Sequence, residues 1–301
     1  MSRVLVLWYS QTGQLRRVAE SALAPLEEAG HELHWERVTP RREFPFPWRL
    51  RDFLSVFPDT AALRGCEIEP PAVDPDEHFD LVVIAYTVWY LSPSLPFQGL
   101  FASPARELVR DRPVLTVIAC RNMYFSAERI MRRLIREAGG RPAGTIALTD
   151  DGPAWASFVT TPRWLLTGKR DRWGLMPPAG ISDETIAAGR RFGEALAARP
   201  ELLGTPAAGA ALEELEPRSV DRPMVLPDLL LGRVFRIWAA AIRRLTPEGG
   251  GARRLAESAL GAGLLVTVPA VVSSLVFLRL VAHDEAERVT ERFLRSLETT
   301  A

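Results

Sequence analysis

The sequence contains little cysteine and no net charge, and these two absences argue against several classes of protein. Its two cysteines, Cys66 and Cys120, belong to no CxxC pair, which argues against a disulfide framework and a zinc site. A formal charge of zero gives no electrostatic attraction for nucleic acid, so we expect no nucleic-acid partner. The N-terminus also lacks a basic region followed by an apolar stretch and a cleavage site, which predicts a cytoplasmic main domain.

What the sequence does contain is typical of a globular α/β protein. Of its 301 residues, 47% are apolar and 25% charged, and short apolar runs alternate with helical patterns over the first 200. The predicted strands are 3–8, 32–38, 80–85, 114–119 and 144–148, and the predicted helices are 14–29, 126–138 and 182–198. This alternation predicts a five-stranded parallel sheet of flavodoxin-like order 2-1-3-4-5, with helices on both faces.

Two long insertions interrupt this pattern within residues 1–200. Residues 39–78 are rich in proline and aromatic side chains, and residues 150–180 carry three tryptophans and four prolines. Neither is readable as regular structure, and both are too long for a simple connection. The alanine-, proline- and glutamate-rich residues 201–228 are predicted to be a linker to an extension over 229–301.

The extension contains apolar helices. Residues 229–245 form a predicted amphipathic helix with several arginines, and residues 258–278 run without a charge for a length that could cross a bilayer. A polar helix at 284–297 ends the chain. The alternative is a buried hairpin, packed on the main domain or in a dimer interface. We favour contact with the inner face of the cytoplasmic membrane through residues 229–281, and we expect a homo-oligomer.

The turn between the first predicted strand and helix carries the main functional signal. Its sequence is Tyr9-Ser10-Gln11-Thr12-Gly13-Gln14-Leu15. Main-chain N–H groups at the helix N-terminus can hold a phosphate there. Ser10 and Thr12 add hydroxyl donors, and Gly13 permits close approach of the backbone. The turn lacks GxGxxG, which disfavours a dinucleotide site, and it lacks GxxxxGK[ST], which excludes a P-loop.

This turn resembles the phosphate loop of flavodoxins and FMN-dependent quinone reductases. The resemblance implies FMN as the cofactor and directs attention to two further loops that follow predicted strands. These loops contain Thr87, Val88, Trp89 and Tyr90, and Cys120, Arg121, Asn122 and Met123. In that family the first loop flanks the isoalloxazine ring and the second contacts its polar edge. Thr87 stands where the family often has proline, and Arg121 is either a partner of anionic reduced flavin or a solvated side chain.

The whole chain resembles a narrower family of flavodoxin-like proteins from dialkylresorcinol and flexirubin-type pigment biosynthesis, known as dialkylresorcinol condensing enzymes. The resemblance covers nearly the whole chain, including its hydrophobic C-terminal part. It rests on the motifs YSQTGQL (9–15), FPFPW (44–48), VWYLSPSLP (88–96), CRNM (120–123), FVTTPRWLLTGK (158–169) and PPAGISDE (177–184). The motifs at 44–48 and 158–169 lie in the two insertions, which ordinary flavodoxins lack.

Condensation itself needs a cysteine nucleophile paired with histidine or asparagine, and the four histidines form no such constellation with either cysteine. The resemblance therefore implies a different step. A ketosynthase-like partner would form a dialkylcyclohexane-1,3-dione, and this chain would dehydrogenate that lipid-like dione to a dialkylresorcinol with FMN. The alternatives are an NAD(P)H-dependent quinone or flavin reductase, an electron-transfer flavodoxin, and a non-catalytic partner of the ketosynthase.

The residue that would move the proton is not fixed by the sequence. Candidates by loop position are Tyr90, Tyr124, Asp150 and Asp151. Enolisation of a 1,3-dione is also easy enough to proceed without a dedicated base. Residues of the second insertion that could line the substrate side are Trp155, Arg163, Trp164 and Trp173.

Overall fold

Five strands form one parallel sheet in the computed structural model, which describes residues 1–246 and 250–298. The strands are β1 (Arg3–Trp8), β2 (Glu32–Arg37), β3 (Leu81–Tyr86), β6 (Pro113–Cys120) and β7 (Arg141–Thr149). Their order in the sheet is β2-β1-β3-β6-β7, and every neighbouring pair is parallel. This confirms the predicted order 2-1-3-4-5.

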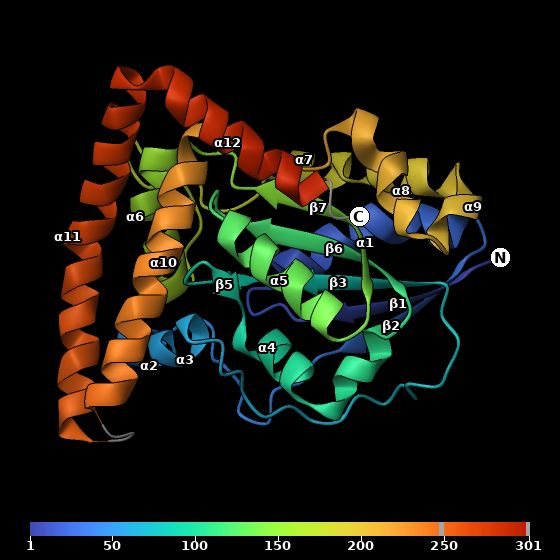
Figure 1. Ribbon diagram of the computed structural model, residues 1–301, viewed down its shortest axis with the longest axis horizontal. Helices are drawn as coiled ribbons and strands as arrows, with labels where there is room; N and C mark the ends of the chain where they lie inside the picture. The colour runs from blue at the N-terminus through green and yellow to red at the C-terminus, as the bar shows by residue number, and fades with distance from the viewer. Residues whose placement is uncertain (247–249, 299–301) are drawn as a thin grey trace.

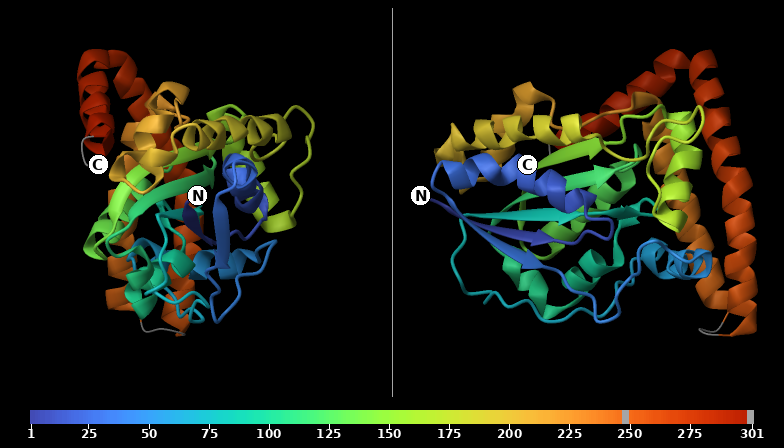
Figure 2. Two further views of the ribbon diagram at one scale, coloured as in Figure 1. Left: turned by 90° about the vertical axis from the view of Figure 1, so that its right-hand side faces the viewer. Right: turned by 180° about the vertical axis from the view of Figure 1, so that it is seen from behind.

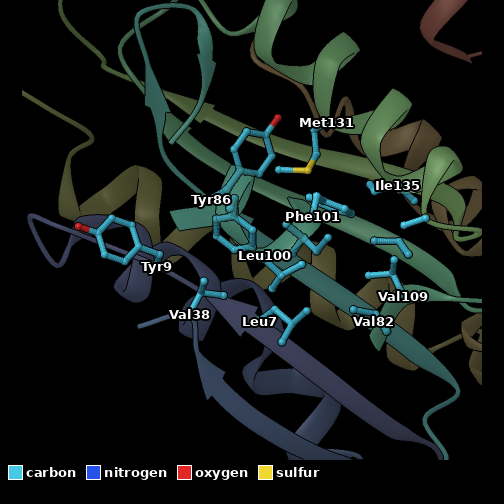
Figure 3. Packing of buried hydrophobic residues seen from close by; sticks show 14 of the residues in the cluster. Leu7, Tyr9, Val38, Val82, Tyr86, Leu100, Phe101, Val109, Met131 and Ile135 are labelled. Atoms are coloured by element: carbon cyan, nitrogen blue, oxygen red, sulfur yellow. The ribbon is translucent and has the colours of Figure 1, made fainter. Parts of the chain in front are cut away.

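Helices cover both faces of the sheet because alternate strand residues point to opposite faces. On one face, Leu5 and Leu7 pack with residues of α4 (Leu95–Ala102) and α5 (Phe125–Glu137). Figure 3 shows this core close by, with Leu7, Val82 and Leu100 lying together. On the other face, Val4 and Val6 pack with residues of α1 (Gln14–Glu28) and α8 (Arg190–Ala197).

Shorter elements connect these layers. A 3-10 helix, η1 (Pro104–Val109), follows α4. The helix predicted at 182–198 is instead two helices, α7 (Asp183–Ala188) and α8, separated at Gly189. The predicted helix start is confirmed, because the Ser182 hydroxyl accepts a hydrogen bond from the Thr185 N–H at 3.1 Å.

Both insertions contain regular structure. The first includes the short helices α2 (Leu50–Ser55) and α3 (Phe57–Ala61), and the second includes α6 (Ala154–Thr167). A small hairpin of β4 (Val88–Trp89) and β5 (Ser92–Pro93) follows β3. In Figures 1 and 2, α2, α3 and α6 lie at the end of the molecule towards which the strands point. The insertions therefore gather at the carboxyl edge of the sheet.

The expected linker over 201–228 differs in the structure. It contains α9 (Pro200–Leu203) and the 3-10 helix η2 (Pro206–Leu215), whose Ala208 and Leu212 are fully buried. The following segment adds to the edge of β7, where the Ala147 N–H donates to the Pro217 carbonyl at 2.8 Å. These residues pack on the sheet and do not form a free linker.

The C-terminal extension consists of three helices: α10 (Arg222–Leu245), α11 (Gly251–Val281) and α12 (His283–Glu298). Helices α10 and α11 lie side by side at the carboxyl edge of the sheet (Figures 1 and 2). Buried Phe57 of α3 packs there with Leu231 and Phe235 of α10 and Val272 of α11, forming a third core. Among the residues that the structure describes, no helix has the length and apolar character needed to cross a membrane.

A buried carboxylate fixes α10 to the sheet domain. Asp228 is fully buried, and its two carboxylate oxygens accept the main-chain N–H groups of Phe125 at 3.0 Å and Ser126 at 2.8 Å. These N–H groups are the unpaired donors of the first turn of α5, so a residue of α10 caps α5 from outside.

Candidate functional site

The turn after β1 has the backbone geometry of an open anion cradle. Gly13 precedes α1 with φ +81°, and a Cβ there would meet nothing within 4 Å. The Gln14 N–H donates to the Thr12 hydroxyl at 3.3 Å, so this one donor of the first turn is already paired. In the described part of the chain, the N–H groups of Gln11, Thr12 and Gly13 donate no hydrogen bond. The turn thus presents donors at the positive end of α1.

Several buried polar groups around this turn have no partner within the described residues. They are the hydroxyl oxygens of Ser10 and Thr87 and both polar atoms of the Asn122 amide. Such groups are normally hydrogen-bonded, and leaving one unpaired costs about 1–3 kcal/mol. These three residues follow β1, β3 and β6, which are neighbouring strands. Unsatisfied polar groups therefore lie at the carboxyl ends of three neighbouring strands.

The loop after β3 is a tight hairpin with a strained turn. Val88 and Trp89 of β4 pair with Pro93 and Ser92 of β5, leaving Tyr90 and Leu91 to form the turn. Their φ angles are +48° and +58°. Two-residue hairpins of this hand usually contain asparagine or glycine, because a side chain disfavours the left-handed region. Strain of this kind clusters at functional sites.

Trp89 of this hairpin lies within a group of aromatic rings. Its ring contacts Tyr9 at a centroid distance of 6.0 Å, Phe44 at 5.0 Å and Trp48 at 5.4 Å, each nearly edge to face. Phe44 and Trp48 come from the first insertion. An apolar aromatic wall therefore stands beside the β1 turn.

Tyr90 packs against the first insertion and α10. Its hydroxyl donates to the Phe53 carbonyl at 2.6 Å, and its ring packs against Phe57 at 5.0 Å and Phe235 at 6.5 Å. Burial raises the pKa of Tyr90 well above its ordinary value. Because its hydroxyl is hydrogen-bonded and its pKa is raised, Tyr90 is poorly suited to proton transfer. Its ring instead connects the site to α10.

In the loop after β6, Arg121 is held by α6. Its Nε donates to the Ser157 hydroxyl, and its guanidinium lies 3.9 Å from the centroid of the Phe158 ring. Burial lowers the pKa of Arg121 to about 10, while nearby Asp150 acts to raise it. The residue remains a cation at neutral pH. Cys120 is a free thiol whose pKa burial raises, so it is a poor nucleophile.

Asp150, directly after β7, holds the second insertion in place. One carboxylate oxygen accepts the Gly152 N–H at 2.8 Å and the other accepts the Gly180 N–H at 2.7 Å. Burial raises the pKa of Asp150, against the lowering effect of these N–H groups and of Arg121. Gln14 ties the same segment to α1, because its amide donates to the Ile181 carbonyl at 3.0 Å and accepts the Ile181 N–H at 3.2 Å.

The two insertions contact each other and cover the site. Residues 44–48 of the first insertion and α6 of the second form this cover, which we call the roof. The Trp48 N–H donates to the Leu165 carbonyl at 2.8 Å, and the rings of Phe46 and Trp164 contact at a centroid distance of 6.1 Å. Gln11 reaches the first insertion, where its amide donates to the Pro45 carbonyl at 2.8 Å. The two insertions are thus joined to each other and to the turn at 10–15.

Beneath this roof is a cavity of about 210 Å³. Ten predicted site residues line it: Gln11, Thr12, Gln14, Leu15, Thr87, Val88, Trp89, Tyr90, Cys120 and Arg121. A second cavity of about 810 Å³ lies between η2, β7 and α12. The larger cavity contains none of the three predicted loops, so we assign the functional site to the smaller one, at the edge where open α/β sheets bind ligands.

No protein-family model and no curated protein matches the chain. Similar solved structures include an archaeal flavodoxin (10% identity, TM-score 0.36, covering 66% of this chain and 99% of that one) and a Lactobacillus acidophilus flavoprotein in complex with FMN (18%, 0.39, 49% and 93%). An NAD(P)H:quinone oxidoreductase from Methanothermobacter marburgensis is also similar (14%, 0.30, 56% and 99%). The chain has a flavodoxin-like fold.

Four of the predicted site residues are absent from the lining of the smaller cavity. Ser10, Gly13, Asn122 and Met123 do not line it; Ser10 and Asn122 contribute the unpaired groups, and Met123 packs against the α10 core. Of the proton-transfer candidates, Asp150 and Tyr90 line the cavity, and the Tyr90 hydroxyl is already hydrogen-bonded to the Phe53 carbonyl. The Tyr124 hydroxyl donates to the Ser219 carbonyl at 3.2 Å. Asp151 accepts from Ser182 and Thr185.

Of the expected substrate-side residues, Trp164 lines the cavity. Arg163 pairs with Asp171 at 3.0 Å, Trp173 is 57% exposed, and the side chain of Trp155 lies outside the described residues. Seven further lining residues were not predicted from the sequence: Trp48, Phe53, Val56, Ala119, Thr161, Leu165 and Gly180. The motifs FPFPW and FVTTPRWLLTGK contain three of these and could have indicated them.

Proposed function

We propose that this chain is an FMN-dependent oxidoreductase. The phosphate would bind the turn at 10–15, and the isoalloxazine ring would lie between the loops at 87–90 and 120–123. The observation that carries the proposal is the presence of unpaired buried hydroxyl and amide groups at the ends of the neighbouring strands β1, β3 and β6. A bound ligand with phosphate, ribityl and ring acceptors would satisfy them.

The residues present fit this cofactor. Donors at an open helix N-terminus suit a phosphate without a cation, and the lining aromatics suit a flat ring. The cavity of about 210 Å³ is below the roughly 300–1,000 Å³ of most ligand sites. The roof would therefore have to shift outwards, breaking contacts such as Trp48 with Leu165, to admit the ring.

For the substrate, we propose a dialkylcyclohexane-1,3-dione that is converted to a dialkylresorcinol. This step removes two hydrogens, one as hydride and one as a proton, and the product aromatises by tautomerisation. Bound FMN supplies the two-electron acceptor. The apolar aromatic lining and the motifs at 44–48 and 158–169 support a lipid-like ring. Asp150 at the cavity wall would accept the proton, and Arg121 would hold positive charge beside the ring.

Cofactor binding is tested by titration with FMN and with riboflavin, which lacks the phosphate. We expect Ser10→Ala to weaken FMN binding roughly tenfold or more, because a hydrogen bond to a charged group contributes about 1.5–3 kcal/mol. Riboflavin affinity should stay unchanged. Ser21→Ala is the matched control, since that hydroxyl lies on α1 and donates to the Ile186 carbonyl. A protein that takes up no FMN would refute the proposal.

The substrate is tested by mixing the FMN-loaded protein with a synthetic 2,5-dialkylcyclohexane-1,3-dione without oxygen. We expect the absorbance of bound oxidised flavin to fall as one equivalent of resorcinol forms. If the flavin stays oxidised with the dione but is reduced readily by NAD(P)H, the dehydrogenase proposal fails and a quinone or flavin reductase is favoured.

A further inference from the structure

The second insertion presents two large apolar side chains to solvent at the tip of a turn. Trp173 is 57% exposed and Leu175 is 92% exposed. They flank Gly174, whose φ is +58° and which has open space around it. Tryptophan and leucine are usually buried, so their combined exposure on a projecting turn marks a contact surface.

The tip belongs to an ordered hairpin over residues 168–180. Trp173 and Met176 exchange two main-chain hydrogen bonds, at 3.2 and 2.9 Å, and the Ala179 N–H donates to the Arg170 carbonyl at 2.8 Å. At its base, Gly168 lies against the ring of Pro47 and Gly180 is held by Asp150. The backbone of this 168–180 hairpin is therefore set before any partner binds, which lowers the entropic cost of binding.

The charges around the tip are mainly positive. Lys169 and Arg172 are exposed, and Arg170 lies between them. The one acidic residue of the hairpin, Asp171, is neutralised by Arg163 at 3.0 Å. Exposed tryptophan and leucine surrounded by cations suit the interface of an anionic bilayer, where aromatic rings sit at the headgroups and cations attract anionic lipid.

We propose that the 168–180 hairpin docks on the surface of an anionic lipid bilayer, with Trp173 and Leu175 inserted among the headgroups. The hairpin directly follows α6, whose Trp164 and Leu165 line the cavity. Docking would bring the roof of the site to the lipid surface, where a lipid-like substrate dissolves. That consequence rests on the proposed function, whereas binding to the bilayer does not.

The test is co-sedimentation of the full chain with phosphatidylcholine vesicles, with and without phosphatidylserine. We expect binding to the phosphatidylserine vesicles. W173S/L175S should weaken it about tenfold or more because it removes the inserted apolar surface, and K169Q/R172Q should abolish the preference for phosphatidylserine. Leu50→Ser and Ile237→Ser are matched controls, because these side chains are 57% and 67% exposed on α2 and α10. Both controls should bind as the unaltered protein does.

Three results would overturn the proposal. In the first, the unaltered chain binds neither kind of vesicle. In the second, the tip variant binds normally while Ile237→Ser does not, which would place the contact on α10 within residues 229–281. Light scattering could also show that the tip variant dissociates an oligomer, making the hairpin a contact between copies. Leu175→Ser alone serves if the double variant fails to fold. Flavin content, measured in parallel, reports on the proposed function separately.

Discussion

Gly13 and Gly180 both have positive φ, at +81° and +85°, but their surroundings differ. A Cβ at Gly13 meets nothing, whereas one at Gly180 would lie 2.9 Å from the Gln14 amide and from the Trp164 ring. Gly13→Ala should therefore lower the free energy of unfolding by about 1–2 kcal/mol through backbone strain alone. We expect Gly180→Ala to cost more, because it also displaces the roof. Urea unfolding of both variants checks this, and equal losses would contradict the packing described for Gly180.

Asp150 is the carboxylate that the site places at the cavity wall, so its role can be separated from that of its neighbour. We expect Asp150→Asn to slow flavin reduction by the dione roughly 100-fold or more, the usual contribution of a positioned base. Asp151→Asn should have little effect, because that carboxylate binds Ser182 and Thr185.

The pH dependence gives a second readout for Asp150. Burial raises its pKa, so the rate should rise with pH through a value above the ordinary ~3.9 of aspartate. Asp150→Asn should remove this limb from the rate profile. If the variant keeps both the rate and the limb, enolisation of the dione proceeds without a protein base.

At the residue scale, the position of the turn at 10–15 between the first strand and the first helix was predictable because its pattern is local. Ser10, Thr12 and Gly13 lie within four positions, directly before the first residue of α1. Trp48 and Phe53 were not predictable as lining residues. They reach the cavity from the first insertion, which has no period that indicates which side chains face inwards.

Among the elements, the strands were predicted to within three residues at either end, because the four buried strands contain continuous apolar runs and the edge strand β2 alternates. Helices α2 and α3 have six and five residues, too few to show a helical period. The segment 201–228 has the composition of a linker. It packs on the sheet because Gly209 approaches the backbone of Ala143 and Gly144 so closely that a Cβ would lie 2.3 Å from the Ala143 carbonyl oxygen.

The contact between α10 and α5 should depend on pH through Asp228. Burial raises the pKa of Asp228 to about 6, although the N–H groups of α5 and Arg129 act to lower it. In the unfolded chain the pKa of Asp228 is ~3.9. Between about pH 4 and pH 6 the folded state therefore keeps a proton that the unfolded state loses. The stability that Asp228 contributes is therefore fully present below about pH 4 and is lost as the pH rises through about 6.

Asp228→Asn tests this contribution because an amide keeps one acceptor oxygen but does not titrate. The free energy of unfolding of the unaltered protein, relative to the variant, should fall by up to ~3 kcal/mol between about pH 4 and pH 7. Denaturation with urea at several pH values measures the difference. A difference that is constant with pH would show that Asp228 has the same pKa in both states.

At the scale of the whole molecule, the C-terminal helices α10 and α11 pack against residues that surround the candidate site. The core shared by α3, α10 and α11 also contacts Tyr90, Leu91 and Met123, which belong to the loops after β3 and β6. Tyr90 and Leu91 keep left-handed backbone angles, which persist only when surrounding contacts enforce them. The extension should therefore influence cofactor binding, although α10 supplies no residue to the cavity.

Phe235 of α10 allows a test of this coupling. Its ring packs against Phe57 at 5.5 Å and Tyr90 at 6.5 Å. Phe235→Ala should lower the free energy of unfolding by about 3–5 kcal/mol and also weaken FMN binding, because the strained turn loses its support. Phe192→Ala is the matched control, since that ring is fully buried on the opposite face of the sheet beside α1. It should cost similar stability without changing FMN affinity. If both variants weaken FMN equally, the effect is a general loss of stability, and the extension is not coupled to the site.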